Sequence, residues 1–427
     1  MAIVILLSLV AVSCRQDNIF QIIASETAPR KPRIEGAPTN MVVFNRGDVP
    51  IMYVASGRLH WYAKAPEGSD VDGSQWDLNE YHIPQPGGKI ISLAVTSDGD
   101  GGERLYALCR DGNSVSATLR YIESDGADWV TIPPPVDRTY PVIQSIYADS
   151  STNRLFAGAG KNDANQATYA ILYLDNETDT LKLLRANTSI FSGAVSDGVT
   201  HYLSTRGNGS RGGIFPISEA ALKNADQGIA PIDPDSIQPL SEGVAENESG
   251  NSNRMFMSII KLKNGAIIAV ERNGGALYKV QNGSFERMRY NNQKQDLINI
   301  GKYATEAITL WERIDSTTGV ATSSQIVIGI QGGLFSTTTS SHTYGYVEFE
   351  LDPGSDSIVN RHDPPSQSVD NQDRYTASLG KHPLNHLFQA PQSVDENMTF
   401  FASTQTAGLW SYRDRPDNGG LQWNAEE

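Results

Sequence analysis

Two acid–base pairs are the residues of this chain best suited to chemistry. Glu271 and Arg272 lie near the end of one predicted strand, and Glu312 and Arg313 lie near the end of another. Two carboxylates can act as general acid and general base on a glycosidic bond, but the separation that matters is a distance in space. We expect both pairs to be candidates for contacts in a central channel, while solvated strand ends would explain the same residues. No catalytic residue is predicted.

Other polar patterns lack the context that metal binding needs. Asp98, Asp100 and Glu103 loosely resemble a calcium loop, yet Ca²⁺ takes about six to eight oxygen ligands and their spacing fits no known loop. His382 and His386 are four residues apart, but a proline separates them and no glutamate occupies the position that a zinc protease helix requires. The sequence therefore predicts no metal site.

A glycine-rich segment at residues 207–212 matches the pattern G-x-G-x-x-G. A phosphate cradle also needs a helix that opens from the loop and a parallel strand that follows it. Residues 213–217 read Gly-Ile-Phe-Pro-Ile and continue as a strand, so the pattern indicates a flexible hairpin. No cofactor is predicted.

Charge and cysteine content exclude further classes of protein. The net charge is −15 and the basic residues are scattered apart from a cluster at residues 30–33, whereas a protein that neutralises phosphates needs a basic face. Nucleic-acid binding is therefore excluded. The two cysteines, Cys14 and Cys109, cannot form a disulfide framework, and we expect Cys109 to be a small buried residue on a strand.

The elements that must position any site are repeated strands. A short apolar strand, a turn closed by glycine and an apolar–aromatic pair recur along the chain, most clearly at Gly408-Leu409-Trp410 and Gly333-Leu334-Phe335. The copies begin roughly 45 to 75 residues apart, which is the spacing of propeller blades that carry loop insertions. Segments of alternating polarity bounded by Gly, Asn or Asp predict antiparallel strands joined by tight turns.

These repeats resemble the bacterial β-propellers that include photosystem-assembly-type, regulator-sensor and sialidase-like repeats. The resemblance implies an all-β fold, a β-propeller of seven four-stranded blades over residues 40–427, although the spacing also fits six or eight. The sialidase Asp box is not present, so a sialidase is not expected. The predicted innermost strands are residues 41–44, 90–95, 142–147, 192–195, 255–260, 307–311 and 387–390.

The N-terminal residues predict where the protein is located. An apolar run at residues 2–12 has the length of a signal-peptide core, and it ends in Val-Ala-Val-Ser-Cys at Cys14, which resembles the lipobox of bacterial lipoproteins. The resemblance implies a signal peptide over residues 1–13, acylation of Cys14, and a lipidated linker over residues 14–39. Arg15 follows the cysteine, which in that family favours the outer membrane. An ordinary secretory signal would also fit the apolar run.

Together these features predict a lipoprotein of the bacterial cell envelope, anchored to the membrane by lipid. Its β-propeller is expected to be a non-catalytic binding or scaffold module for an envelope protein or a glycan. One alternative is a propeller enzyme, a glycoside hydrolase or lyase with its active site in the axial channel. Another is a scaffold for the assembly of outer-membrane proteins. Fold alone does not decide among them.

Overall fold

The structure is a computed structural model. It describes the following residues: 34, 37–47, 49–55, 61–64, 76, 86–97, 102–112, 116–126, 128–149, 152–161, 168–207, 212–242, 254–272, 276–281, 283–289, 306–313, 325–331, 346–352, 357–362, 384–405, 408–415 and 420–426. Predictions for Cys14, for the segments around it and for His382 lie outside these residues.

The described strands form seven sheets, which we number 1 to 7 in chain order. Five of them contain four or more described strands, and sheets 1 and 4 contain three. Sheet 1 comprises β1 (Met41–Arg46), β2 (Val49–Ala55) and β3 (Trp61–Lys64). Sheet 2 comprises β4 (Lys89–Ser97), β5 (Glu103–Arg110), β6 (Ala117–Glu123) and β7 (Val130–Thr131). Sheet 3 comprises β8 (Val142–Asp149), β9 (Arg154–Gly160), β10 (Tyr169–Asp175) and β11 (Thr180–Thr188).

The second half of the chain continues in the same way. Sheet 4 comprises β12 (Phe191–Ser196), β13 (Thr200–Thr205) and β14 (Gly213–Ser218), and the helix α2 (Glu219–Asp226) follows it directly. Sheet 5 comprises β16 (Phe256–Lys261), β17 (Ile267–Glu271), β18 (Leu277–Gln281) and β19 (Ser284–Arg287), with β15 (Ser241–Glu242) parallel to β19. Sheet 6 comprises β20 (Glu306–Arg313), β21 (Gln325–Gln331), β22 (Tyr346–Leu351) and β23 (Ile358–His362). Sheet 7 comprises β24 (Leu384–Gln389), β25 (Phe400–Thr404), β26 (Leu409–Arg415) and β27 (Gly420–Ala425).

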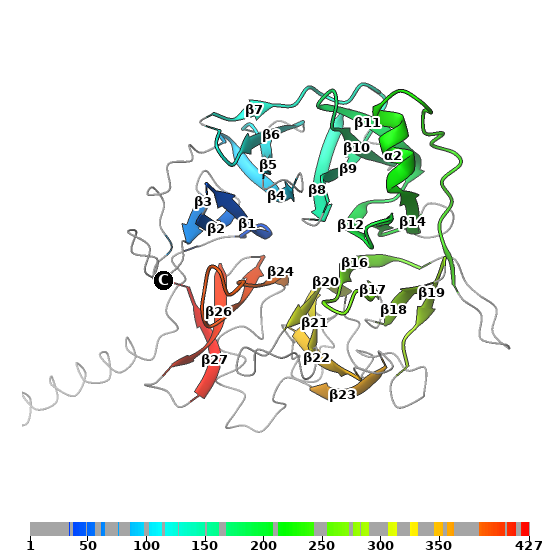
Figure 1. Cartoon of the computed structure of the whole chain (residues 1–427). Coiled ribbons are helices and arrows are strands. Elements are labelled where there is room, and N and C mark those ends of the chain that lie inside the picture. The colour runs from blue at the N-terminus through cyan, green and yellow to red at the C-terminus, as the bar shows by residue number, and fades with distance from the viewer. Residues whose placement is uncertain are drawn as a thin grey trace, which may run out of the picture.

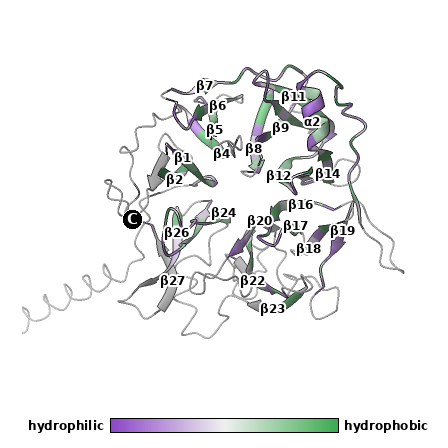
Figure 2. Ribbon diagram, viewed as in Figure 1, coloured by the Kyte–Doolittle hydropathy of each residue, from purple (hydrophilic) through white to green (hydrophobic). Residues whose placement is uncertain are grey.

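The sheets are arranged in a ring around a common centre, with the first long strand of each sheet innermost (Figure 1). Burial falls from the inner part of a sheet to its rim: every residue of β9 is buried, whereas in β19 only Phe285 is. The ribbon of β19 is coloured as mainly hydrophilic in Figure 2. The predicted all-β fold is confirmed, and each predicted inner strand overlaps an observed one, although β24 begins three residues before its predicted start. The expectation of four strands in every sheet does not hold among the described residues, because sheet 5 gains the parallel strand β15.

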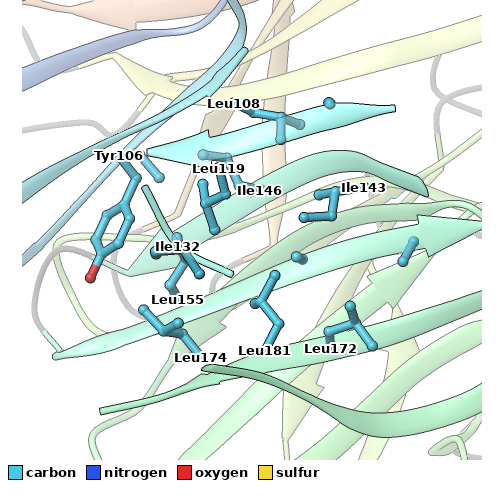
Figure 3. Packing of buried hydrophobic residues seen from close by; sticks show 14 of the residues in the cluster. Tyr106, Leu108, Leu119, Ile132, Ile143, Ile146, Leu155, Leu172, Leu174 and Leu181 are labelled. Carbon is cyan, nitrogen blue, oxygen red and sulfur yellow. The ribbon is translucent and has the colours of Figure 1, made fainter. Parts of the chain in front are cut away.

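Hydrophobic clusters join each sheet to its neighbour. The described residues form seven such clusters, one at each interface around the ring, and the cluster between sheets 2 and 3 is shown in Figure 3. Each inner strand contributes at least one buried residue to the cluster with the preceding sheet, and these include Met41, Leu93, Ile146, Ala194, Ile259, Leu310 and Leu387. The glycine-turn aromatics Phe215, Tyr278 and Trp410 lie in these clusters. The repeated phrase is therefore a device for packing between sheets.

The ring closes where sheet 7 meets sheet 1. The backbone N–H of Leu409 donates to the carbonyl of Ile34 at 3.1 Å, and the indole of Trp76 donates to Glu426 at 2.7 Å. Ile34 is completely buried in the cluster between these sheets. Ile34 belongs to the segment predicted as a linker, so the folded part of the chain includes at least this residue upstream of residue 40.

A smaller sequence prediction is also confirmed. Cys109 is buried on β5, and burial raises the pKa of its thiol to about 11. β7 lies at the outer edge of sheet 2 and is followed by Ile132 and Pro133, a position that suits proline because it cannot donate to a central ladder. Among the described residues, no helix is long and apolar enough to cross a membrane.

Candidate functional site

A cavity of about 930 Å³ lies inside the ring, and the inner strands of all seven sheets line it. Its volume lies in the range of ligand pockets, about 300–1,000 Å³. Side chains along each inner strand alternate between the cluster with the preceding sheet and the cluster with the following sheet, and residues of both kinds border the cavity. We take this axial cavity as the candidate site.

A bulge at the same place in six inner strands sets the first layer. The pairing of each inner strand with its neighbour shifts by one residue near the start of β4, β8, β12, β16, β20 and β24. The residue after each shift, with Asn40 just before β1, lines the cavity. We call these residues the polar ring: Asn40, Ser92, Ser145, Gly193, Ser258, Thr309 and His386. A bulge re-aims side chains, and here the Ser92 hydroxyl donates to the carbonyl of Ile146 in the following sheet at 3.3 Å.

Two residues further along each inner strand, the lining becomes apolar. These residues border the cavity and also lie in, or pack against, the hydrophobic cluster with the following sheet. We call them the apolar ring: Val42, Ala94, Tyr147, Val195, Ile260, Trp311 and Phe388. The cavity therefore presents a polar layer directly beside a layer of aliphatic and aromatic groups.

The largest aromatic group in the cavity wall lies at the junction of sheets 6 and 7. The ring centroids of Trp311 and Phe388 are 5.2 Å apart, and those of Trp311 and His386 are 6.1 Å apart in an edge-on arrangement. The indole Nε1 of Trp311 and Nε2 of His386 are buried and have no hydrogen-bond partner in the protein. Burial lowers the pKa of His386 to about 4, so this imidazole is neutral at pH 7.

The lowered pKa of His386 predicts a loss of stability in acid. The unfolded chain binds the proton near pH 6.5, whereas the folded chain binds it only near pH 4. Stability should therefore fall between about pH 6.5 and pH 4, by on the order of 1–3 kcal/mol from this group. The His386→Gln variant should lose this part of the pH dependence. Urea denaturation at pH 7 and at pH 4 measures it, and an equal fall in both proteins would contradict the assignment.

Two carboxylates at one end of the cavity accept hydrogen bonds from the backbone of neighbouring sheets. Asp149, at the end of β8, accepts a hydrogen bond from the backbone N–H of Ser196 at 2.7 Å. Glu312, near the end of β20, accepts one from the backbone N–H of Lys263 at 2.7 Å. Both bonds connect adjacent sheets, so both carboxylates have a structural role. The second oxygen of Glu312, Oε1, is buried without a partner.

The four residues predicted as channel contacts do not converge. Glu312 is the one of them among the described residues that line the cavity. Arg313 lies over the rings of Phe400 and Tyr412 of sheet 7, 5.8 and 5.2 Å from the centroids. The other two residues belong to local contacts of sheet 5.

In sheet 5, Glu271 accepts hydrogen bonds from Arg254 at 3.2 Å and from the Tyr278 hydroxyl at 3.0 Å. The side chain of Arg272 contacts the sulfur of Met255 at 3.7 Å. Residues 213–218 form β14, as predicted for the segment after the glycine-rich pattern. Within the described part of the chain, no group of three or more His, Cys, Asp or Glu side chains could hold a metal ion.

Sequence reasoning missed a second polar cluster, which lies beside a cavity of about 460 Å³. Arg154 of β9 contacts Glu219 at 2.9 Å and Asp226 at 2.5 Å, both from α2, and His201 of β13 contacts Glu219 at 2.7 Å. Burial alone would raise the pKa of Glu219, but hydrogen bonds from His201 and Arg154 outweigh it and lower that pKa to about 2. The cluster holds α2 against sheets 3 and 4. One local signal was available, since Ser218 caps the helix immediately before Glu219.

Comparisons with known proteins agree on the fold. The chain matches no protein-family profile and no curated protein. Among solved structures, an ancestral GH74 enzyme is 13% identical with a TM-score of 0.51, over 93% of this chain and 47% of that one. YCF48 bound to a D1 peptide is 10% identical with a TM-score of 0.47, over 91% of this chain and 95% of that one. These neighbours are β-propeller proteins, and the chain has a β-propeller fold.

A third neighbour is the extracellular domain of a putative hybrid two-component system from B. thetaiotaomicron. It is 10% identical with a TM-score of 0.44, over 89% of this chain. This chain spans 39% of the length of that structure. At these identities the likeness concerns the fold alone.

Proposed function

We propose that this protein is a cell-envelope lipoprotein whose β-propeller is a non-catalytic binding module for an envelope protein or a glycan. In this proposal the seven sheets are the seven blades of one propeller, Cys14 carries the lipid, and the linker precedes the first blade. Attachment to the outer membrane follows from Arg15 in the position after the acylated cysteine. The sequence features around Cys14 support this part of the proposal.

The observation that carries the binding role is the lining of the axial cavity. Its polar ring and its apolar ring form a preformed concave surface that is mostly apolar with a few polar groups, as ligand-binding sites usually are. Acid–base catalysis by a carboxylate pair would need two acids free to exchange protons with a substrate. Asp149 and Glu312 instead accept hydrogen bonds from neighbouring sheets, so their arrangement favours binding over hydrolysis.

The test is affinity capture from native envelopes. The full-length protein with a C-terminal tag is expressed in a diderm bacterium, cross-linked in intact cells, and purified after detergent extraction. We expect an envelope protein or glycan to co-purify, and we expect a Cys14→Ser variant to leave the membrane fraction. Recovery of barrel-assembly subunits would favour the scaffold alternative. Turnover of a glycan or lactone library by the lipid-free protein at enzymatic rates would refute the non-catalytic role.

A further inference from the structure

Several residues that line the axial cavity carry a buried polar atom without a hydrogen-bond partner in the protein. Besides Trp311 Nε1 and His386 Nε2, the Nε of Arg206 and the hydroxyl of Ser145 are buried without a hydrogen-bond partner, and all four residues line the cavity. Buried polar groups are almost always paired, because an unpaired one costs the full desolvation penalty of the group. Indole and guanidinium nitrogens can only donate, so the groups that suit these side chains are acceptors such as an oxyanion.

The charge of the lining is uneven along the axis. Lys89, the first residue of β4, and Arg206 lie toward the end where the inner strands begin, since the backbone N–H of Arg206 donates to the carbonyl of Ile190 just before β12 at 2.8 Å. Asp149, Lys261 and Glu312 lie at the opposite end, where the inner strands finish. The first end therefore carries two cations and no acid among the described lining residues. An anionic group would be favoured there.

Three aromatic side chains line the cavity: Tyr147, Trp311 and Phe388. Tyr147 packs edge-on against Phe191, with centroids 5.0 Å apart, and Trp311 and Phe388 belong to the same apolar ring on other sheets. The backbone N–H of Arg206 donates to Ile190, the residue before Phe191, so Tyr147 and Arg206 both lie near Phe191. A ligand whose apolar part packs against these rings could therefore place a polar group next to the guanidinium of Arg206.

Inside the cavity the apolar ring disfavours a sugar chain, so of the ligands considered above we set the glycan aside for this cavity. A glycan presents hydroxyl groups all around, each of which needs a partner when it is buried. Val42, Ala94, Val195 and Ile260 provide none. Burial of an aromatic or aliphatic body suits these side chains better.

We propose that the axial cavity binds an amphipathic organic anion, with an aromatic or aliphatic body against Trp311, Phe388 and Tyr147 and an oxyanion paired with Arg206. This inference rests on the binding role proposed above and names the class of ligand for the cavity. The oxyanion accepts from the guanidinium of Arg206, which lines the cavity. Lys89 adds to the attraction at the entrance.

Two matched fluorescent probes test this proposal on the full-length protein. 1-Anilinonaphthalene-8-sulfonate carries the aromatic body and an oxyanion, and N-phenyl-1-naphthylamine carries the same body without the charge. We expect one probe molecule per chain and about tenfold tighter binding of the sulfonate, the worth of one charge-assisted pair. The Arg206→Gln variant should remove this preference and leave the neutral probe unaffected. The Phe388→Ala variant should bind both probes more weakly.

Controls separate the cavity from the surface and from misfolding. Arg138 is exposed and lies outside the cavity lining, so Arg138→Gln should change neither probe. Should Arg206→Gln fail to fold, the wild-type protein decides the question, because the preference for the sulfonate must shrink as salt is raised. Each of three results would overturn the proposal. They are equal affinity for the two probes, loss of the sulfonate preference in Arg138→Gln as well as in Arg206→Gln, and displacement of the sulfonate by maltohexaose.

The outcome also separates this inference from the proposed function. Capture of an envelope partner together with equal binding of the two probes overturns the anion site and leaves the binding module standing. A clear sulfonate preference in the absence of any captured partner supports the anion site and counts against the envelope partner.

Discussion

Replacement of Arg154 by methionine is expected to destabilise the protein by about 3–5 kcal/mol, because it leaves buried carboxylates without their cation. The side chain of Arg154 is 4% exposed, and it pairs with Glu219, 21% exposed, and Asp226, 6% exposed. Methionine fills a similar volume, so the cost comes from the unpaired charges. Denaturant unfolding monitored by circular dichroism measures the change. The exposed residue Arg138, replaced in the same way, should shift stability by no more than about 0.5 kcal/mol.

The same cluster predicts how the Arg154 effect depends on pH. The pKa of Glu219 is lowered from 4.5 to about 2, so its ionised form contributes stability above about pH 4.5, and this contribution is lost as the pH falls toward 2. Protonation of the carboxylates removes the charges that Arg154 neutralises. The difference in unfolding free energy between wild type and Arg154→Met should therefore become smaller as the pH falls. A gap that is constant from pH 7 to pH 3 would show that Arg154 acts through packing alone.

The Phe256→Ala variant is expected to lose about 3–5 kcal/mol of stability through a cavity in the core. Phe256 is fully buried at the start of β16, and its ring lies 5.5 Å from that of Tyr278 and 5.2 Å from that of Phe285, edge-on in both cases. These three rings fill the space between sheets 4 and 5, and neighbouring strands hydrogen-bonded in sheet 5 restrict collapse into the gap. A shift in the urea midpoint at constant slope would report the loss.

Its control is an apolar side chain that contributes little to any cluster. Ile229, just after α2, is 68% exposed, and Ile229→Ala should change stability by no more than about 0.5 kcal/mol. A Phe256→Ala effect as small as this would mean that the sheets repack to fill the cavity.

Much of the fold could be predicted because strands and turns leave patterns among residues that are close together in the sequence. Alternating polarity and glycine turns located every inner strand, and the glycine-turn aromatics lie between sheets as their apolar character required. The start of β24 was placed at residue 387, whereas the strand begins at Leu384. The bulge before His386 explains the error, because an extra residue resets the alternation from which the strand was inferred.

The site was less predictable because it depends on contacts between distant segments. Arg154, His201 and Glu219 come from three elements, and nothing local marks them as partners. The two rings of the cavity likewise require the register of all seven inner strands. Glu271 and Arg272 show the reverse case, since their sequence pattern suggested a channel but their contacts lie within sheet 5.

The seam between sheets 7 and 1 has a consequence for the synthesis of the chain. Trp76 and Glu426, which are bonded across it, are 350 positions apart. At about 5–20 residues per second, a ribosome needs roughly 20–70 s to make the intervening chain. During that time Met41, Met52 and Val54 of sheet 1 lack the neighbour that covers them in the closed ring. Every newly made molecule therefore passes through an incomplete ring in which the apolar face of sheet 1 is exposed. A chaperone that binds this face would protect the nascent chain from aggregation until the last sheet is made.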